Sequence, residues 1–167
     1  MPRRHVPLGN IRLLVLDVDG VLTDGRLYFD AQGEALKVFH VRDGAGIKAV
    51  QSAGIDVAVI SGRQSQAALQ RCRELGICEV MLGVDDKAQA FVQLCEKLGV
   101  APRECCCIGD DDAEVPLLRQ AGLAVVVADA HANARRVAHR ATRAGGGAGA
   151  VREVCDWLLG ARRARRT

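Results

Sequence analysis

Two aspartates near the start of the chain are spaced so that they could share one reaction centre. Asp17 and Asp19 directly follow the apolar run Leu13–Leu16, which is typical of a strand buried on both faces. Residues i and i+2 of an extended chain project to the same side, so both carboxylates are expected at the end of that strand. Like charges held this close repel each other, and the usual compensation is a hard cation such as Mg²⁺. The following Gly20 lets the backbone turn away sharply.

Three further polar groups also follow segments that have the pattern of buried strands. Ser61 follows residues 56–60 and precedes Gly62 and Arg63. On its own, a serine here is typical of a helix cap, but the glycine allows close backbone approach to an anion and the arginine adds charge beside it. The segment therefore has two interpretations, a cap or an anion-binding turn.

A lysine and an acidic cluster complete the set. Lys87 stands at the start of a helix expected over residues 86–98, where its charge is slightly unfavourable against the helix dipole. Asp110, Asp111 and Asp112 follow the apolar residues 105–108. Adjacent acids at a strand end are costly unless they share a cation, so the alternative is a plain acidic surface loop.

The elements that must position these residues alternate between strand and helix patterns. This alternation predicts an α/β fold, a three-layer doubly wound parallel sheet with right-handed crossovers and helices on both faces. Segments 26–29 and 34–39 read as a small β-hairpin, and neither insertion point has room for a cap domain. Expected strands are 13–16, 56–60, 77–82, 105–108 and 123–127, and expected helices are 43–54, 65–75, 86–98, 114–121, 130–139 and 149–159.

Composition sets limits on the class of protein. With 167 residues, 49% of them hydrophobic, residues 1–167 are expected to form one domain with a real core. No apolar run approaches the roughly 18 to 20 residues of a membrane span, and residues 1–10 lack a signal-peptide apolar stretch, so we expect a cytoplasmic protein without membrane association. The seven cysteines are odd in number, and three lie in one apolar run, which indicates a reducing compartment rather than disulfides.

Charge is concentrated at the two ends of the chain. The net charge is +3, and six arginines without any acid lie in the tails 1–10 and 161–167, so the rest of the chain carries about −3. Aromatic residues make up only 3%. This pattern does not predict a nucleic-acid surface. The two basic tails are expected to be solvated ends, with a contact to a neighbouring subunit or an anion as the alternative.

The run from Asp17 to Gly25 resembles the first signature of the haloacid dehalogenase superfamily. The resemblance implies that Asp17 is the nucleophile of phosphoryl transfer, that Asp19 is its acid/base partner, and that Ser61 and Lys87 bind the phosphoryl group. It also implies a Mg²⁺ ion held by Asp17, Asp110 and the backbone carbonyl of Asp19, with Asp111 as a further metal ligand or its support. Glu114 departs from the pattern, where Asp is expected, which leaves its role open.

Longer segments are similar to the 3-deoxy-D-manno-octulosonate 8-phosphate (KDO 8-phosphate) phosphatase family over nearly the whole chain. They are residues 38–47, 61–63, 71–77 and 145–156. A capless site lies open to water, so a neighbouring copy is expected to supply its missing walls in a homo-oligomer, with the hairpins in the interface. The resemblance implies a homotetramer that acts in lipopolysaccharide precursor synthesis. The implied substrate-binding residues are His40, Arg42, Asp43, Gly44, Lys48, Gly62, Arg63 and Arg71.

Several alternatives remain open at this point. Forked guanidinium groups suit the carboxylate of a sugar acid, but Arg71 also fits a solvated helix position. His40, where the family is expected to have Asn, fits a general acid, a sugar contact or an interface residue. The substrate could be the phosphate of a related nine-carbon sugar acid, and the chain could be a non-catalytic oligomerisation module. A phospho-acceptor receiver domain would lack both Asp19 and the hairpin.

Overall fold

The centre of the protein is a six-stranded parallel sheet. The computed structural model describes residues 7–165, and its main sheet has the strand order β5–β4–β1–β6–β7–β8. β1 lies in the middle and pairs with β4 on one side and β6 on the other. The strands are β1 (Leu13–Leu16), β4 (Asp56–Ile60), β5 (Glu79–Met81), β6 (Cys105–Gly109), β7 (Leu123–Val126) and β8 (Arg140–Ala141).

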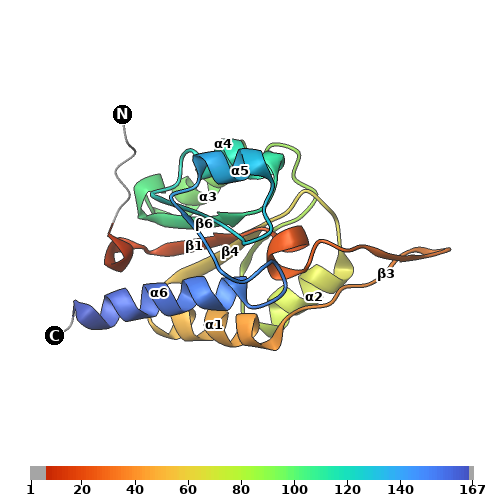
Figure 1. Ribbon diagram of the computed structural model, residues 1–167, viewed down its shortest axis with the longest axis horizontal. Coiled ribbons are helices and arrows are strands. Elements are labelled where there is room, and N and C mark those ends of the chain that lie inside the picture. The colour runs from red at the N-terminus through yellow and green to blue at the C-terminus, as the bar shows by residue number, and fades with distance from the viewer. Residues whose placement is uncertain (1–6, 166–167) are drawn as a thin grey trace.

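Helices cover both faces of this sheet, so the expected three-layer α/β architecture is confirmed (Figure 1). α1 (Val41–Ser52), α2 (Gln66–Glu74) and α6 (Ala150–Ala164) lie on one face. α3 (Lys87–Leu98), α4 (Val115–Leu118) and α5 (Ala132–Val137) lie on the other. No helix within residues 7–165 is both long and apolar enough to cross a bilayer.

The central strands are buried because their sequences are apolar without interruption. Every residue of β1 and β6 is buried, including Cys105, Cys106 and Cys107 with no exposed surface. All seven cysteines are free thiols. Burial raises the pKa of the Cys106 and Cys107 thiols, so these residues act as small core hydrophobes and not as reactive groups.

A two-stranded antiparallel hairpin projects from the body, as the sequence predicts. It consists of β2 (Tyr28–Asp30) and β3 (Gly33–Leu36), and it extends away from the C-terminal end of α6 (Figure 1). Both strands are shorter than the segments 26–29 and 34–39 suggest. The chain after β3 leaves the hairpin and leads directly to α1, which begins at Val41 with His40 as its N-cap.

The expectation of a solvated C-terminal tail is wrong for Arg162 and Arg165, whereas Arg163 is exposed as expected. The tail continues α6 to Ala164, beyond the expected end of that helix at residue 159. The Arg162 guanidinium donates hydrogen bonds to the carbonyl oxygens of Ala53 at 2.6 Å and Ile11 at 3.1 Å. Arg165 likewise donates to the Gly9 carbonyl at 2.8 Å. The side chains of Arg162 and Arg165 thus fasten the end of α6 to neighbouring segments, while Arg3, Arg4 and Arg166 lie outside the described residues.

Candidate active site

Strand register brings the predicted residues to one edge of the sheet. Leu16 of β1 pairs with Val59 of β4 and with Ile108 of β6. Asp17 therefore leaves the sheet beside the residues that lead to Ser61 and Asp110. In parallel sheets this carboxyl edge is where ligands bind. The four sequence signals, Asp17, Ser61, Lys87 and Asp110, all follow strands that end there.

The innermost group is an ion-pair cluster around Lys87. Its Nζ lies 2.9 Å from Asp17 Oδ1 and also donates to Glu114 Oε1. The three side chains are at most 6% exposed. Burial alone would lower the pKa of Lys87, but the charges of Asp17 and Glu114 raise it above its usual value, so the side chain stays an ammonium ion.

Asp110 adds a third carboxylate to the cluster. Asp17, Asp110 and Glu114 each offer an oxygen, and these oxygens lie within 4.8 Å of one another. Burial, followed by the charges of Glu114, Asp17 and Asp111, raises the pKa of Asp110 to about 8. Burial also raises the pKa of Asp17 to about 6, against the attraction of Lys87. The three carboxylates of this cluster therefore outnumber its one ammonium group.

The chemistry of this cluster fits a magnesium ion. Three carboxylates and one ammonium give a net charge of −2 when all are ionised, which one Mg²⁺ would neutralise. Glu114 already accepts bonds from Lys87 and from the Asp111 backbone N–H at 3.0 Å. Asp17 and Asp110 are therefore the residues best suited to hold the cation, since carboxylate oxygens are its preferred ligands.

A tight turn after Asp17 sets the position of these groups. Gly20 has a φ of +90°, and a Cβ there would lie 2.0 Å from Asp110 Oδ2, so only glycine fits beside that carboxylate. Thr23 Oγ1 accepts hydrogen bonds from the N–H groups of Gly20 at 3.3 Å and Gly25 at 3.2 Å. Behind the turn, a Cβ on Gly146 would lie 1.9 Å from the Gly20 carbonyl oxygen, so the glycine segment 145–147 packs directly against it.

Asp19 belongs to a second charged group, formed with the hairpin. Lys37 Nζ lies 2.6 Å from Asp19 Oδ1 and 3.0 Å from Glu34 Oε2. Burial alone would lower the pKa of Lys37, but its hydrogen bonds to Asp19 and Glu34 raise it. Arg63 Nε lies 3.8 Å from the other oxygen of Asp19. The expected pair Asp17 and Asp19 thus has separate cationic partners.

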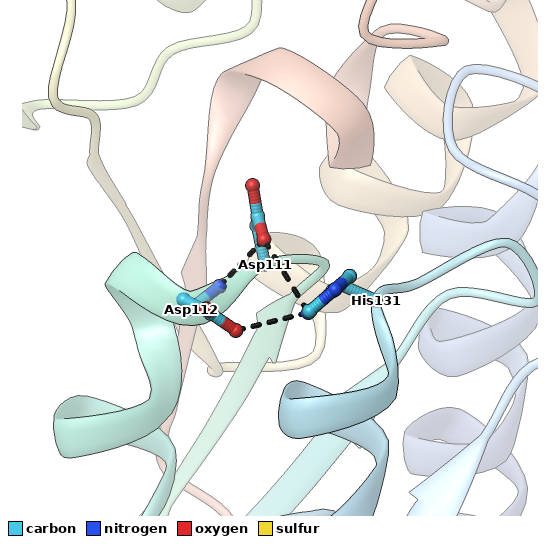
Figure 2. A group of neighbouring side chains, drawn as sticks. All are labelled: Asp111, Asp112 and His131. Atoms are coloured by element: carbon cyan, nitrogen blue, oxygen red, sulfur yellow. Dashed lines mark hydrogen bonds and ion pairs between the residues drawn. The ribbon is translucent and has the colours of Figure 1, made fainter.

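Asp111 is placed differently from the ligand or support that the sequence suggests. Its carboxylate accepts from the Asp112 backbone N–H at 2.8 Å and is 67% exposed. Figure 2 shows it with Asp112 and His131, whose Nδ1 lies 3.0 Å from Asp112 Oδ1. The His131 backbone N–H also donates to the Asp110 carbonyl at 2.7 Å. This exposed group links the β6 loop to the start of α5, and the metal role of Asp111 stays a prediction without support from its contacts.

Ser61, Gly62 and Arg63 lie at the edge of the cluster. Ser61 is buried, and its Oγ accepts weakly from the Arg63 backbone N–H at 3.5 Å. A Cβ on Gly62 would lie 3.9 Å from Lys87 Cε, so this turn borders the Lys87 side chain. The helix cap of α2 is Ser65, whose hydroxyl accepts from the Ala68 N–H at 3.2 Å. Ser61 therefore does not cap α2, which leaves its hydroxyl for an anion.

The remaining predicted substrate residues lie along α1 and α2. Gly44 and Arg71 are neighbours, since a Cβ on Gly44 would lie 2.4 Å from Arg71 Nη2. His40 Nδ1 accepts from the exposed Arg42 backbone N–H at 3.2 Å. Lys48 is exposed on α1.

Asp43 has a structural partner, because it is buried and accepts from the Arg152 backbone N–H of α6 at 2.8 Å. Burial raises the pKa of its carboxyl group. Its predicted role in substrate binding gains no support from these contacts. The roles of the other predicted substrate residues on α1 and α2 stay predictions.

Sequence reasoning missed Lys37 and Glu34 and left Glu114 open. Glu34 and Lys37 are three residues apart, a spacing that occurs by chance in many loops, and nothing local indicates that Lys37 reaches Asp19. For Glu114 a signal existed. It lies in the acidic segment after β6, and a longer side chain than Asp can reach Lys87 from further away.

Comparisons with known proteins identify the family of the chain. A family model described as haloacid dehalogenase-like hydrolase matches residues 28–122. The chain is 49% identical over 150 residues to the 3-deoxy-D-manno-octulosonate 8-phosphate phosphatase KdsC of Escherichia coli (strain K12), covering 90% of this chain and 80% of that relative. The chain belongs to this phosphatase family of haloacid dehalogenase-like hydrolases.

Solved structures of family members superpose closely on it. A phosphatase from Moraxella catarrhalis, crystallised with a magnesium ion, a phosphate ion and a KDO molecule, has a TM-score of 0.91 and 40% identity, covering 93% of this chain and 90% of that one. A cobalt-bound phosphatase from Haemophilus influenzae has a TM-score of 0.92 and 42% identity, covering 95% and 92%. The fold is therefore shared with this family.

The raised pKa of Asp110 predicts a pH-dependent stability that a metal ion removes. Its pKa rises from 3.8 to about 8 in the folded state, so between these values the folded chain holds a proton that the unfolded chain has released. The free energy of unfolding of the metal-free protein therefore falls as pH rises through this window. Asp110→Asn lacks the titrating group, and its melting temperature at pH 8 in a chelator is expected to exceed that of the wild type by about 5 °C.

Thermal unfolding with a chelator and with Mg²⁺, at pH 5 and pH 8, checks this. Mg²⁺ is expected to stabilise the wild type at pH 8 and not Asp110→Asn. The control is Asp56→Asn, a change of an exposed carboxylate at the start of β4. Equal pH dependence in Asp110→Asn and the wild type, both free of metal, would contradict the excess negative charge of this site.

Proposed function

We propose that the chain is a Mg²⁺-dependent phosphatase that hydrolyses KDO 8-phosphate to KDO and phosphate through an aspartyl-phosphate on Asp17. The observation that carries the proposal is the buried Asp17 carboxylate, one oxygen of which is held 2.9 Å from Lys87 Nζ at the carboxyl edge of the sheet. Family membership at 49% identity supports the substrate, and the acidic cluster supports the metal.

In the first step, Asp17 attacks phosphorus and the bond from phosphorus to the sugar oxygen breaks. Lys87 holds Oδ1 of Asp17, which leaves Oδ2 for the attack, and its charge reduces the repulsion between carboxylate and phosphate. Asp19 donates a proton to the departing sugar oxygen. When bound, Mg²⁺ supplies further positive charge between the two anions, and Asp17 and Asp110 would hold it with the Asp19 carbonyl.

In the second step, water attacks the phosphorus of the aspartyl-phosphate. Asp19, now a carboxylate, takes a proton from this water, and the Asp17 carboxylate is regenerated as phosphate leaves. Ser61 and Lys87 are suited to bind the phosphoryl oxygens. Arg63 is suited to the sugar acid, because its side chain is 44% exposed and its Nε lies 3.8 Å from Asp19 Oδ2.

The compartment of this enzyme is proposed to be the cytoplasm, where precursors of lipopolysaccharide would be made. The seven free cysteines support a reducing compartment, since thiols in this number are rarely kept unpaired under oxidising conditions.

Phosphate release from a panel of phosphorylated sugar acids tests the function. We expect Mg²⁺-dependent release from KDO 8-phosphate, with at least about a 10-fold lower kcat/KM for a nine-carbon sugar acid 9-phosphate. Asp17→Asn keeps the size of the side chain but removes the nucleophile, and its rate is expected to fall by about 10⁴-fold or more. Release from no member of the panel would contradict a phosphatase, and full activity of Asp17→Asn would contradict the nucleophile.

The hairpin supports a further proposal, that the protein is a homotetramer. Seven large apolar side chains are exposed among residues 7–165, and six of them lie between residues 27 and 41. Monomeric proteins rarely expose so concentrated an apolar surface, and a lone two-stranded hairpin is marginally stable in water. We name these six the hairpin patch: Leu27, Tyr28, Phe29, Leu36, Val38 and Val41, exposed by 38% to 77%.

A second copy on the hairpin patch would also close the site. Phe29 in the patch lies under the Arg63 guanidinium, with 5.9 Å between the guanidinium carbon and the ring centroid, so the patch lies beside a residue that also neighbours Asp19. A chain without a cap leaves the site open to water, and enclosure by a neighbour would exclude it.

The solution mass tests this assembly. Sedimentation of the wild type is expected to give four times the chain mass of 17.8 kDa. The double change Leu36→Asp and Val38→Asp places charge in the hairpin patch and is expected to yield smaller species with lower activity. Val92→Asp, at the exposed position on α3 outside the patch, is the matched control and is expected to keep the mass. A monomeric wild type would contradict the proposal.

A further inference from the structure

Lys37 has a buried side chain on an otherwise exposed part of the chain. Its side chain is only 2% exposed, whereas its neighbours Leu36 and Val38 are 48% and 56% exposed. Lysine is almost never buried unless its charge is paired. A lysine without a partner in the protein would extend its side chain into solvent, so the burial of Lys37 indicates specific partners for its charge.

Two carboxylates pair with the buried ammonium group, and they come from different parts of the fold. Asp19 Oδ1, in the turn after β1, lies 2.6 Å from Lys37 Nζ. Glu34 Oε2, in β3, lies 3.0 Å from it. The ammonium therefore joins the hairpin to the reaction centre.

A chain of contacts anchors this pair to the body of the protein. Glu34 accepts a hydrogen bond from the Ser65 hydroxyl, and Ser65 is the N-cap of α2. Lys37 is thus held by Glu34, and Glu34 is in turn bonded to a residue at the start of α2. Such support from rigid elements is what keeps a reacting side chain in a productive geometry.

The two oxygens of Asp19 differ in a way that suits proton transfer. Oδ1 accepts the short hydrogen bond from Lys37. Oδ2 is buried and accepts no hydrogen bond from residues 7–165, and Arg63 Nε lies 3.8 Å away. One oxygen is held while the other, though buried, has no hydrogen-bond partner among these residues, so Oδ2 is the oxygen left for proton exchange by a general acid/base.

We propose that Lys37 is a positioning residue for the acid/base chemistry, holding Asp19 by Oδ1 so that Oδ2 faces the sugar oxygen of the substrate. The inference rests on the proposed function, because it assigns Lys37 to the step in which that oxygen leaves. Lys37 itself exchanges no proton and contacts no reacting atom. Without the ammonium, Asp19 and Glu34 would repel each other and Asp19 would lose its orientation.

The dependence on the leaving group separates this role from a merely structural one. A sugar alcohol needs a proton from Asp19 as it departs, whereas nitrophenolate leaves without one. The quantity to compare is kcat/KM, which covers the steps up to departure of the leaving group. For Lys37→Met we expect kcat/KM to fall by about 10- to 100-fold with KDO 8-phosphate but by less than about 3-fold with p-nitrophenyl phosphate. Lys37→Arg, which keeps the cation, is expected to recover most of the loss.

Two further variants keep the result interpretable. Glu34→Gln weakens the anchor without removing Lys37 and is expected to show a smaller loss with the same preference for the aryl substrate. Lys97→Met is the matched control, because Lys97 pairs with Glu79 at 2.7 Å on the surface and is 65% exposed. It is expected to leave both substrates unaffected. Solution mass and melting temperature establish that each variant is folded and assembled like the wild type.

The outcomes distinguish this inference from the proposed function. Equal losses for both substrates in Lys37→Met and Glu34→Gln, or no loss in either, would overturn the positioning role while leaving the phosphatase intact. A wild type inactive on both substrates would overturn the proposed function and this inference with it. A loss confined to KDO 8-phosphate, recovered by Lys37→Arg, is the result expected.

Discussion

One buried ammonium group, that of Lys87, is the interaction on which the rest of the site depends. It stands between Asp17 and Glu114 with hardly any exposure to solvent. Removing one partner from such a pair leaves an uncompensated buried charge, which is strongly destabilising. Its position at the first turn of α3 is unfavourable against the helix dipole, and the two carboxylates offset that cost. β1, α3 and the segment after β6 must therefore meet at one point.

The same interaction explains why negative charge remains for a metal ion. Lys87 satisfies Glu114 and one oxygen of Asp17, but among residues 7–165 Asp110 forms no ion pair, and its pKa rises to about 8. The site is thus incomplete as a set of protein charges. A divalent cation would complete it, and the phosphate of a substrate would then meet a centre that is no longer strongly negative.

The parts of this site that the sequence predicts are those governed by local rules. Asp17, Ser61 and Asp110 each follow an apolar run, and parallel strands bring their carboxyl ends to one edge. The fold class follows from the same alternation. Contacts that depend on packing between distant segments are not visible in the sequence, and the bond from Lys37 to Asp19 is such a contact.

The acidic segment after β6 illustrates the limit of a local rule. Three adjacent aspartates give no sign of which side chain turns inward. The short helical turn Asp112–Glu114 decides it, since it directs Glu114 to Lys87 and leaves Asp111 exposed. The C-terminal arginines show the same limit. A basic end of a sequence is typical of a solvated tail, and only the fold shows that Arg162 donates hydrogen bonds to carbonyl groups of distant segments.

The most direct measurement is to find the residue that carries the phosphoryl group during turnover. Wild-type enzyme mixed with KDO 8-phosphate and Mg²⁺, quenched in acid within milliseconds and digested, is expected to yield a phosphorylated peptide whose modified residue is Asp17. Phosphate release without any such adduct, or an adduct on another residue, would contradict the account of Asp17 as a nucleophile held by Lys87.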